Sequence, residues 1–137
     1  MINSYSVLVQ NVNAGQNVLF TNDRCRTKSC QCGGWLSHES GSGLFTISKP
    51  GYYEIQYNAN ITSADTGEIS LVLELNGEAI SGTNAIYNVV TAGVVGHVSA
   101  SALICVPCGC CVTVSLGNNG ANTVSVQNAN IIIKKNA

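Results

Sequence analysis

Charge is the scarcest feature of this sequence. Charged residues make up 9% of its 137 residues, against about 25% in an average domain. Six Lys and Arg face seven Asp and Glu, so we expect no basic surface for nucleic acid or an anionic membrane. Asn, Ser, Thr, Gln and Gly supply the polar surface instead, which is typical of a β-rich protein that packs against copies of itself. The length and the 45% hydrophobic content predict a single domain over residues 1–137.

Long apolar runs and catalytic signatures are also absent. No stretch approaches the roughly 18 apolar residues that span a bilayer, and residues 1–5 show neither the basic nor the apolar region of a secretory signal. The sequence has no nucleophile elbow, phosphate-binding loop or HExxH motif. We therefore expect a protein that is not an enzyme and that uses no cofactor.

Alternation of apolar and polar residues with period two dominates the rest of the chain. Between Tyr52 and Thr62 the odd positions are apolar and the even positions mostly polar, as in a strand with one buried face. The same pattern returns in residues 69–76, 98–104, 112–116 and 128–135. Asn76 and Gly77 predict a type I′ hairpin turn. Because no stretch repeats apolar residues at helical spacing, we predict an all-β antiparallel jelly-roll sandwich with little or no helix.

Some apolar residues fall on positions that we expect to face outward. Together with the low charge, they favour a subunit interface and a homo-oligomer. These residues are Leu8, Leu19, Val72, Leu103 and Ile132.

Three segments, in this order along the chain, carry a resemblance to a known family. Residues 43–55, GLFTISKPGYYEI, combine an aromatic residue, a strand, Pro-Gly and paired aromatics. Residues 71–77 are a strand that ends in Asn-Gly, and residues 126–135 are the closing strand. Over about residues 5–135 the chain resembles the C1q/TNF-like trimeric jelly roll. The closing strand is especially similar to the C-terminal head of bacterial collagen-like exosporium glycoproteins, and related heads occur on phage fibres and capsid decorations.

The resemblance implies a fold and trimerisation, and no chemistry. We expect a non-catalytic homotrimer that serves as a surface, decoration or fibre-head module of a phage virion or a spore coat. Its partners would then be itself and a capsid, fibre or coat protein, and its location the surface of a virion, spore or cell. The alternative is a carbohydrate- or receptor-binding head that uses the loop between Cys25 and Gly43, with Trp35 and His38 facing the ligand.

Seven cysteines form two groups along the chain. Disulfides are the favoured use, because small extracellular domains supplement a limited core in this way. Zinc is the alternative for Cys105 and Cys108, which have zinc-knuckle spacing but lack a good second pair; free thiols are the third reading. The candidates are Cys25, Cys30, Cys32, Cys105, Cys108, Cys110 and Cys111.

Strand counting in a jelly roll places these two groups at opposite ends of the sandwich. The stretch from Thr21 to Gly43 is interpreted as one irregular connection from the first sheet to the second. A strand length of about 17–20 Å would then separate it from the turn at Cys105–Cys111, well beyond the 7 Å that a disulfide allows between Cα atoms. We therefore expect pairing between protomers or stacked trimers rather than between the two groups of one chain.

The acids and histidines offer little for catalysis. Glu54 and Glu74 fall on outward strand positions, where a solvated carboxylate is the common reading. His97 begins a strand without a Ser or Cys beside it in sequence. An enzyme would need a pocket that joins His97 or His38 to a thiolate.

Overall fold

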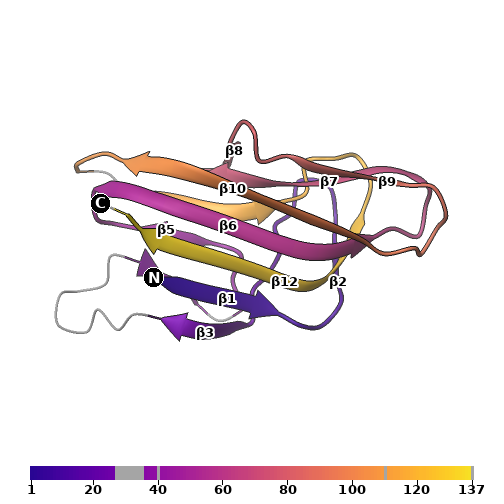
Figure 1. Ribbon diagram of the computed structural model, residues 1–137, viewed down its shortest axis with the longest axis horizontal. Coiled ribbons are helices and arrows are strands. Elements are labelled where there is room, and N and C mark those ends of the chain that lie inside the picture. The colour runs from indigo at the N-terminus through magenta and orange to yellow at the C-terminus, as the bar shows by residue number, and fades with distance from the viewer. Residues whose placement is uncertain (27–35, 40, 110, 137) are drawn as a thin grey trace.

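The computed structural model describes residues 1–26, 36–39, 41–109 and 111–136, with the backbone alone at residues 24–26. The described residues form twelve strands and no helix (Figure 1), so none of them forms a helix that could cross a membrane. The strands are β1 (Ile2–Ser6), β2 (Gln10–Val12), β3 (Asn22–Arg26), β4 (Leu36–Ser37), β5 (Phe45–Ile47), β6 (Gly51–Thr62), β7 (Gly67–Leu75), β8 (Glu78–Ala79), β9 (Ala85–Val89), β10 (Gly96–Val106), β11 (Val112–Gly117) and β12 (Val124–Lys135).

Two antiparallel sheets make up the sandwich. Sheet I has the order β10-β6-β12-β1-β3, with β2 also paired to β12. Sheet II has the order β4-β5-β11-β7-β8, with β9 also paired to β7. This architecture confirms the predicted all-β antiparallel sandwich without helix.

The core lies between the sheets and follows the alternation in the sequence. In β6 the odd positions from Tyr53 to Ile61 are at most 2% exposed, while the even positions are exposed or half-buried. Phe20 and Phe45 add an edge-to-face ring contact at 5.6 Å. Burying a side chain of this size contributes about 1.5–3 kcal/mol, so the apolar alternation favours this face pairing over a register shifted by one residue.

The Asn76-Gly77 turn forms as predicted. Asn76 has φ 52° and Gly77 has φ 82°, the positive values that a type I′ turn requires at both central residues. The turn leads from β7 into β8, where Leu75 pairs with Glu78.

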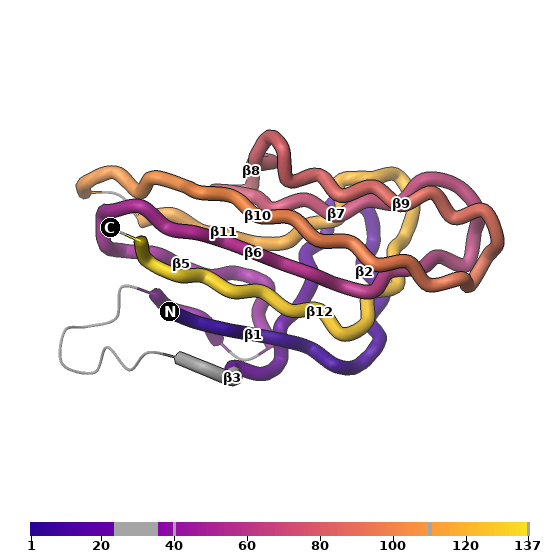
Figure 2. Tube along the Cα trace, in the orientation of Figure 1, coloured from indigo at the N-terminus to yellow at the C-terminus, as the bar shows by residue number. Residues whose placement is uncertain are grey.

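The two ends of the sandwich differ in what they carry. We call the base the end where both chain termini lie, where β6 begins at Gly51 and β10 ends at Val106 (Figure 1). The apex is the opposite end, where β6 ends at Thr62 and β10 begins at Gly96. The tube in Figure 2 follows the long strands of sheet I between these ends.

Two expectations are wrong. The stretch from Thr21 to Gly43 is not wholly irregular, because it contains β3 and β4. Val72 is not available for a subunit interface, because it is 1% exposed within the chain itself. The turn after β11 folds over that face of β7, where Ser70 donates a hydrogen bond to the Oδ1 atom of Asn119 at 2.7 Å.

Candidate functional site

The outward side of sheet I is the broadest candidate surface, and we call it the open face. Residues that pair directly across neighbouring strands share a face, so the registers define its members. Most are amides or hydroxyls, and all are exposed or half-buried. They are Asn3, Tyr5, Gln56, Asn58, Asn60, Ser99, Ser101, Leu103, Asn130 and Ile132, with Glu54 and Lys134 at the base end of the same face and His97 at its apex end.

Amide side chains link the strands of the open face. Asn3 on β1 donates from Nδ2 to the Oδ1 of Asn130 at 2.6 Å and to the carbonyl of Ile131 at 3.1 Å. Nearer the apex, Nδ1 of His97 lies 3.0 Å from Oδ1 of Asn60. These contacts fix the polar side chains of this face, and the Lys134 ammonium lies 3.9 Å from the Glu54 carboxylate at its base end.

A shallow hollow of about 340 Å³ lies on this face between β10, β6 and β12. Gln56, Asn58, Ser101, Asn130 and Ile132 are among its lining residues. No Asp, Glu, His, Lys or Cys lines it, so the hollow offers no general base that could activate its serine hydroxyls. Its chemistry is that of a hydrogen-bonding contact surface.

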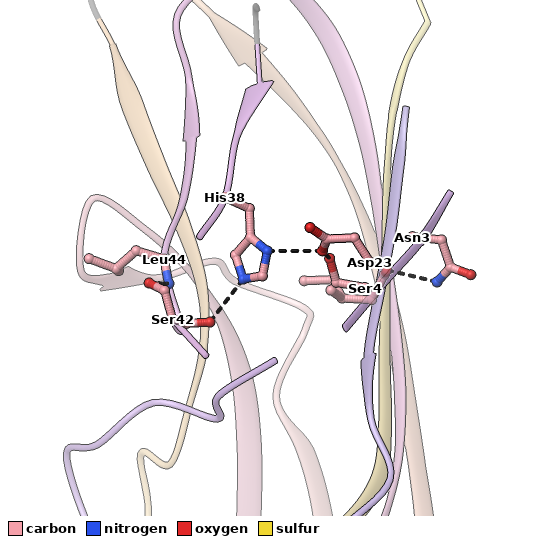
Figure 3. Close-up of polar contacts among 7 residues, drawn as sticks. Asn3, Ser4, Asp23, His38, Ser42 and Leu44 are labelled. Atoms are coloured by element: carbon pink, nitrogen blue, oxygen red, sulfur yellow. Dashed lines mark hydrogen bonds and ion pairs between the residues drawn. The ribbon is translucent and has the colours of Figure 1, made fainter. Parts of the chain in front are cut away.

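A buried polar cluster joins the two sheets at His38 (Figure 3). Its imidazole lies with Nδ1 3.0 Å from Oδ1 of Asp23 and Nε2 2.9 Å from the carbonyl oxygen of Ser42. The same Asp23 oxygen accepts a hydrogen bond from the Ser4 hydroxyl. The His38 ring also stacks on Phe45, with centroids 4.2 Å apart.

Both nitrogens of His38 face acceptors. A carbonyl oxygen cannot donate, so Nε2 carries a proton. The Asp23 oxygen contacts two groups, the Ser4 hydroxyl and the His38 ring. The cluster holds β3 of sheet I to the segment after β4 of sheet II.

This cluster is not a catalytic triad, although it contains Ser, His and Asp. The Ser4 hydroxyl bonds to Asp23 rather than to the imidazole, and Nε2 is occupied by a backbone carbonyl. A triad needs a nucleophile on the imidazole nitrogen that is remote from the carboxylate. The cluster therefore cross-links the two sheets by hydrogen bonds.

The ligand-facing interpretation of His38 is wrong, because the residue is 4% exposed and both ring nitrogens have partners. Trp35 lies outside the described residues. His97 does begin β10, as expected, and it is exposed. Its ring contacts the side-chain amide of Asn60, and no thiol joins it among the contacts of the described residues.

The described thiols lie at the end of β10 and in the turn that joins it to β11. Cys105, Cys108 and Cys111 are exposed and free. Cys25 belongs to β3, where the backbone alone is described, and Cys30, Cys32 and Cys110 lie outside the described residues. Within the described part of the chain, no three His, Cys, Asp or Glu side chains converge to hold a metal ion.

Among the described cysteines, Cys25 of the first group and Cys105 of the second lie toward the same end of the sandwich, so the expected separation to opposite ends is wrong for them. β3 and β10 run in the same direction through sheet I, and both end at the base. The expectation left out one strand: β3 pairs antiparallel with β1 in sheet I before the chain crosses to sheet II. Cys25 and Cys105 are still separated laterally, since β3 and β10 are the two edges of sheet I, four spacings or about 19 Å apart.

The open face was only partly visible in the sequence. The alternation of β6 indicated that Gln56, Asn58 and Asn60 face outward, but nothing indicated which strands would flank them. The strand order β10-β6-β12-β1 places Asn130 and Asn3 beside these β6 residues. The pairing of Asp23 with His38 had no sequence signal, because it depends on β3 and β4 meeting across the sandwich.

The comparisons identify proteins with this fold. No protein-family model matches the chain, and no curated protein matches it. The globular domain of zebrafish complement 1qA protein superposes with a TM-score of 0.67 at 15% identity, over 98% of each chain. Murine APRIL gives a TM-score of 0.65 at 12% identity, over 97% of this chain and 98% of that one. Eiger TNF from S. frugiperda gives a TM-score of 0.65 at 11% identity, over 99% of this chain and 92% of that one. The chain therefore has the jelly-roll fold of C1q and TNF-family heads.

Proposed function

We propose that the protein is a non-catalytic homotrimer that uses the open face of sheet I as its subunit interface. The observation that carries the proposal is a broad sheet face whose middle carries uncharged hydrogen-bonding side chains and a shallow hollow instead of a reactive pocket, with the Glu54–Lys134 ion pair at its base end. Similarity to C1q and TNF-family heads supports a trimeric module. Leu103, 63% exposed on the edge strand β10, adds apolar area to this interface.

The role that fits this chemistry is structural. We infer a surface, decoration or fibre-head module of a phage virion or a spore coat, positioned on the outside of that particle. Support comes from the low charge and from the hydrogen-bonded, hydroxyl- and amide-rich face. The described residues offer no cluster that combines a nucleophile with a free base, which argues against an enzyme.

Cysteine cross-links between protomers are the second part of the proposal. A cyclic trimer has heterologous interfaces, in which one flank of a protomer meets a different flank of the next. The base carries Cys105 and Cys108 at the β10 flank and Cys25 at the β3 flank. Each bond joins two thiols into a disulfide, with two protons and two electrons passing to molecular oxygen or to a disulfide oxidant.

Native mass spectrometry of the full chain tests the trimer. We expect a species at three times 14.3 kDa. Ser101→Arg on the open face should weaken assembly about tenfold or more, because each interface receives a new charge. Ala79→Arg, on exposed β8 of sheet II, is the control and should assemble normally. A monomeric wild type, or a Ser101→Arg trimer as stable as the wild type, would overturn the proposed interface.

The cross-links need a separate readout. Denaturing mass spectrometry without reductant should show covalently joined chains that separate on reduction. Cys105→Ser together with Cys108→Ser should lose these species while the native trimer remains. A trimer without covalent species would refute the cross-links and leave the interface standing.

A further inference from the structure

The positive charges of this chain are segregated along the sequence. Its six Lys and Arg are Arg24, Arg26, Lys28, Lys49, Lys134 and Lys135. No Lys or Arg occurs in residues 1–23 or in residues 50–133. Three short segments, far apart in the chain, therefore carry all of the permanent positive side-chain charge.

The fold gathers these segments at the base. Lys134 and Lys135 end β12, opposite Glu54 and Tyr53 at the start of β6. Lys49 directly precedes that start, and Arg26 on β3 pairs with Ile2. Because β3 and β12 both run toward the base, Arg26, Lys134 and Lys135 occupy backbone positions at the same end as Lys49; Lys28 lies outside the described residues.

Tyr53 links two of these lysines. Its hydroxyl donates a hydrogen bond to the carbonyl of Lys49 at 2.6 Å, and the Lys135 ammonium lies 5.9 Å from its ring centroid. Burial raises the pKa of Tyr53, so its phenol stays neutral and supplies no negative charge to them. The lysine segments are thus fixed beside each other by packing rather than by a counter-ion.

Few acids offset this charge at the base. Glu54 lies 3.9 Å from the Lys134 ammonium, in a partly exposed ion pair. Asp65 and Glu68 lie at the apex end of the sandwich, at the start of β7. Of the seven acids, Asp65 and Glu68 thus lie far from the lysines of the base, so an anionic partner can approach these lysines with little repulsion from them.

We propose that the base is the docking end of the protein and that it binds an acidic protein surface on the particle that the head decorates. The inference rests on the proposed function for the identity of that particle. Lys49, Lys134 and Lys135 would meet carboxylates of the partner, and in a trimer the base would present three copies of this set.

The surroundings of the lysines favour the carboxylates of a polypeptide over the phosphates of a nucleic acid or the sulfates of a sugar polymer. A strand of nucleic acid or sulfated sugar needs a continuous cationic track, whereas here Glu54 interrupts the charges. Tyr52 is 52% exposed and Met1 is 40% exposed at the same end. Aromatic residues and methionine are enriched in protein interfaces.

Retention of the full chain on immobilised poly-L-glutamate at low salt tests the proposal. The wild type should bind and should elute as salt rises, because exposed charge pairs are screened. The triple variant Lys49→Gln, Lys134→Gln and Lys135→Gln should bind about tenfold more weakly or not at all. The matched control with Arg at the same three positions keeps the charge and should bind like the wild type.

Each outcome of these experiments supports or overturns the proposal. No retention of the wild type, or equal retention of the Gln variant, would overturn the proposal. Retention on heparin or single-stranded DNA without retention on poly-L-glutamate would also overturn it and assign a polyanionic polymer instead. Native mass spectrometry of the wild type and of every variant keeps the two proposals separate. A monomeric wild type would refute the proposed function, whereas weaker retention of a Gln variant that is still trimeric assigns the docking end to the lysines.

Discussion

His38 and Asp23 form the polar bridge between the two sheets of this sandwich. Nδ1 of His38 lies 3.0 Å from the Asp23 carboxylate, in a site where the His38 side chain is fully buried. Replacing His38 by Ala leaves Asp23 without this partner, which should lower the free energy of unfolding by about 1.5–3 kcal/mol. Urea denaturation followed by fluorescence measures the change. The exposed neighbour Glu39→Gln is the control and should stay within about 0.5 kcal/mol of the wild type.

A double-mutant cycle distinguishes the bridge from general packing loss. If the two residues act as a pair, the double variant of His38→Ala and Asp23→Ala should cost less than the sum of the single variants. Additive costs would mean that the imidazole stabilises the fold mainly through its stack on Phe45.

Gly96, at the first position of β10, should not tolerate a side chain. A Cβ atom there would lie 2.6 Å from the ring of Tyr87. Gly96→Ala should therefore destabilise the protein by about 1–3 kcal/mol through overpacking. Adding Tyr87→Leu removes the ring and should restore part of the loss. The exposed Ser99→Ala on the same strand is the control, and thermal unfolding is the measurement. A Gly96→Ala variant as stable as this control would contradict the close approach.

Much of the fold could be predicted from the sequence, because the alternation of apolar residues is local information. The inward positions of β6 and the Asn76-Gly77 turn both follow from neighbouring residues. The location of Val72 could not be predicted, because its burial depends on a turn more than forty residues later in the chain.

The site was less predictable than the fold. Counting strands along the chain does not show which sheet a short strand joins. The sequence therefore did not predict β3, and the count placed the two cysteine groups at opposite ends. The base illustrates the same limit. Lys49 and Lys135 are separated by 85 intervening residues, and only the packing of Tyr53 between them shows that they share a surface.

Tyr57 should make the fold sensitive to alkali. Burial raises its pKa to about 12, and its hydroxyl donates to the carbonyls of Leu71 and Thr83. Between the unfolded value near 10 and the folded value, the folded state binds more protons, so stability falls as pH rises. The stabilising effect is fully present below pH 10. Above pH 12 the free energy of unfolding should be lower by roughly 3 kcal/mol.

Unfolding free energies at several pH values test this dependence, with absorbance at 295 nm reporting tyrosinate formation. Tyr57→Phe should cost about 0.5–1.5 kcal/mol at neutral pH. It should also flatten the alkaline decline, since the buried hydroxyl is gone. Exposed Tyr52→Phe is the matched control and should keep the decline. A Tyr57→Phe variant with a wild-type decline would show that another group causes it.

Asn76 should contribute to stability in two separable ways. Its φ of 52° disfavours most side chains, and its Oδ1 accepts a hydrogen bond from the Thr113 amide at 2.9 Å. Asn76→Gly keeps the backbone conformation and loses the hydrogen bond, whereas Asn76→Ala loses both. The Ala variant should therefore be less stable than the Gly variant by about 1 kcal/mol. Chemical denaturation of the two variants gives this difference directly. Equal stabilities would mean that β7 and β8 hold the turn in place without help from its local conformational preference.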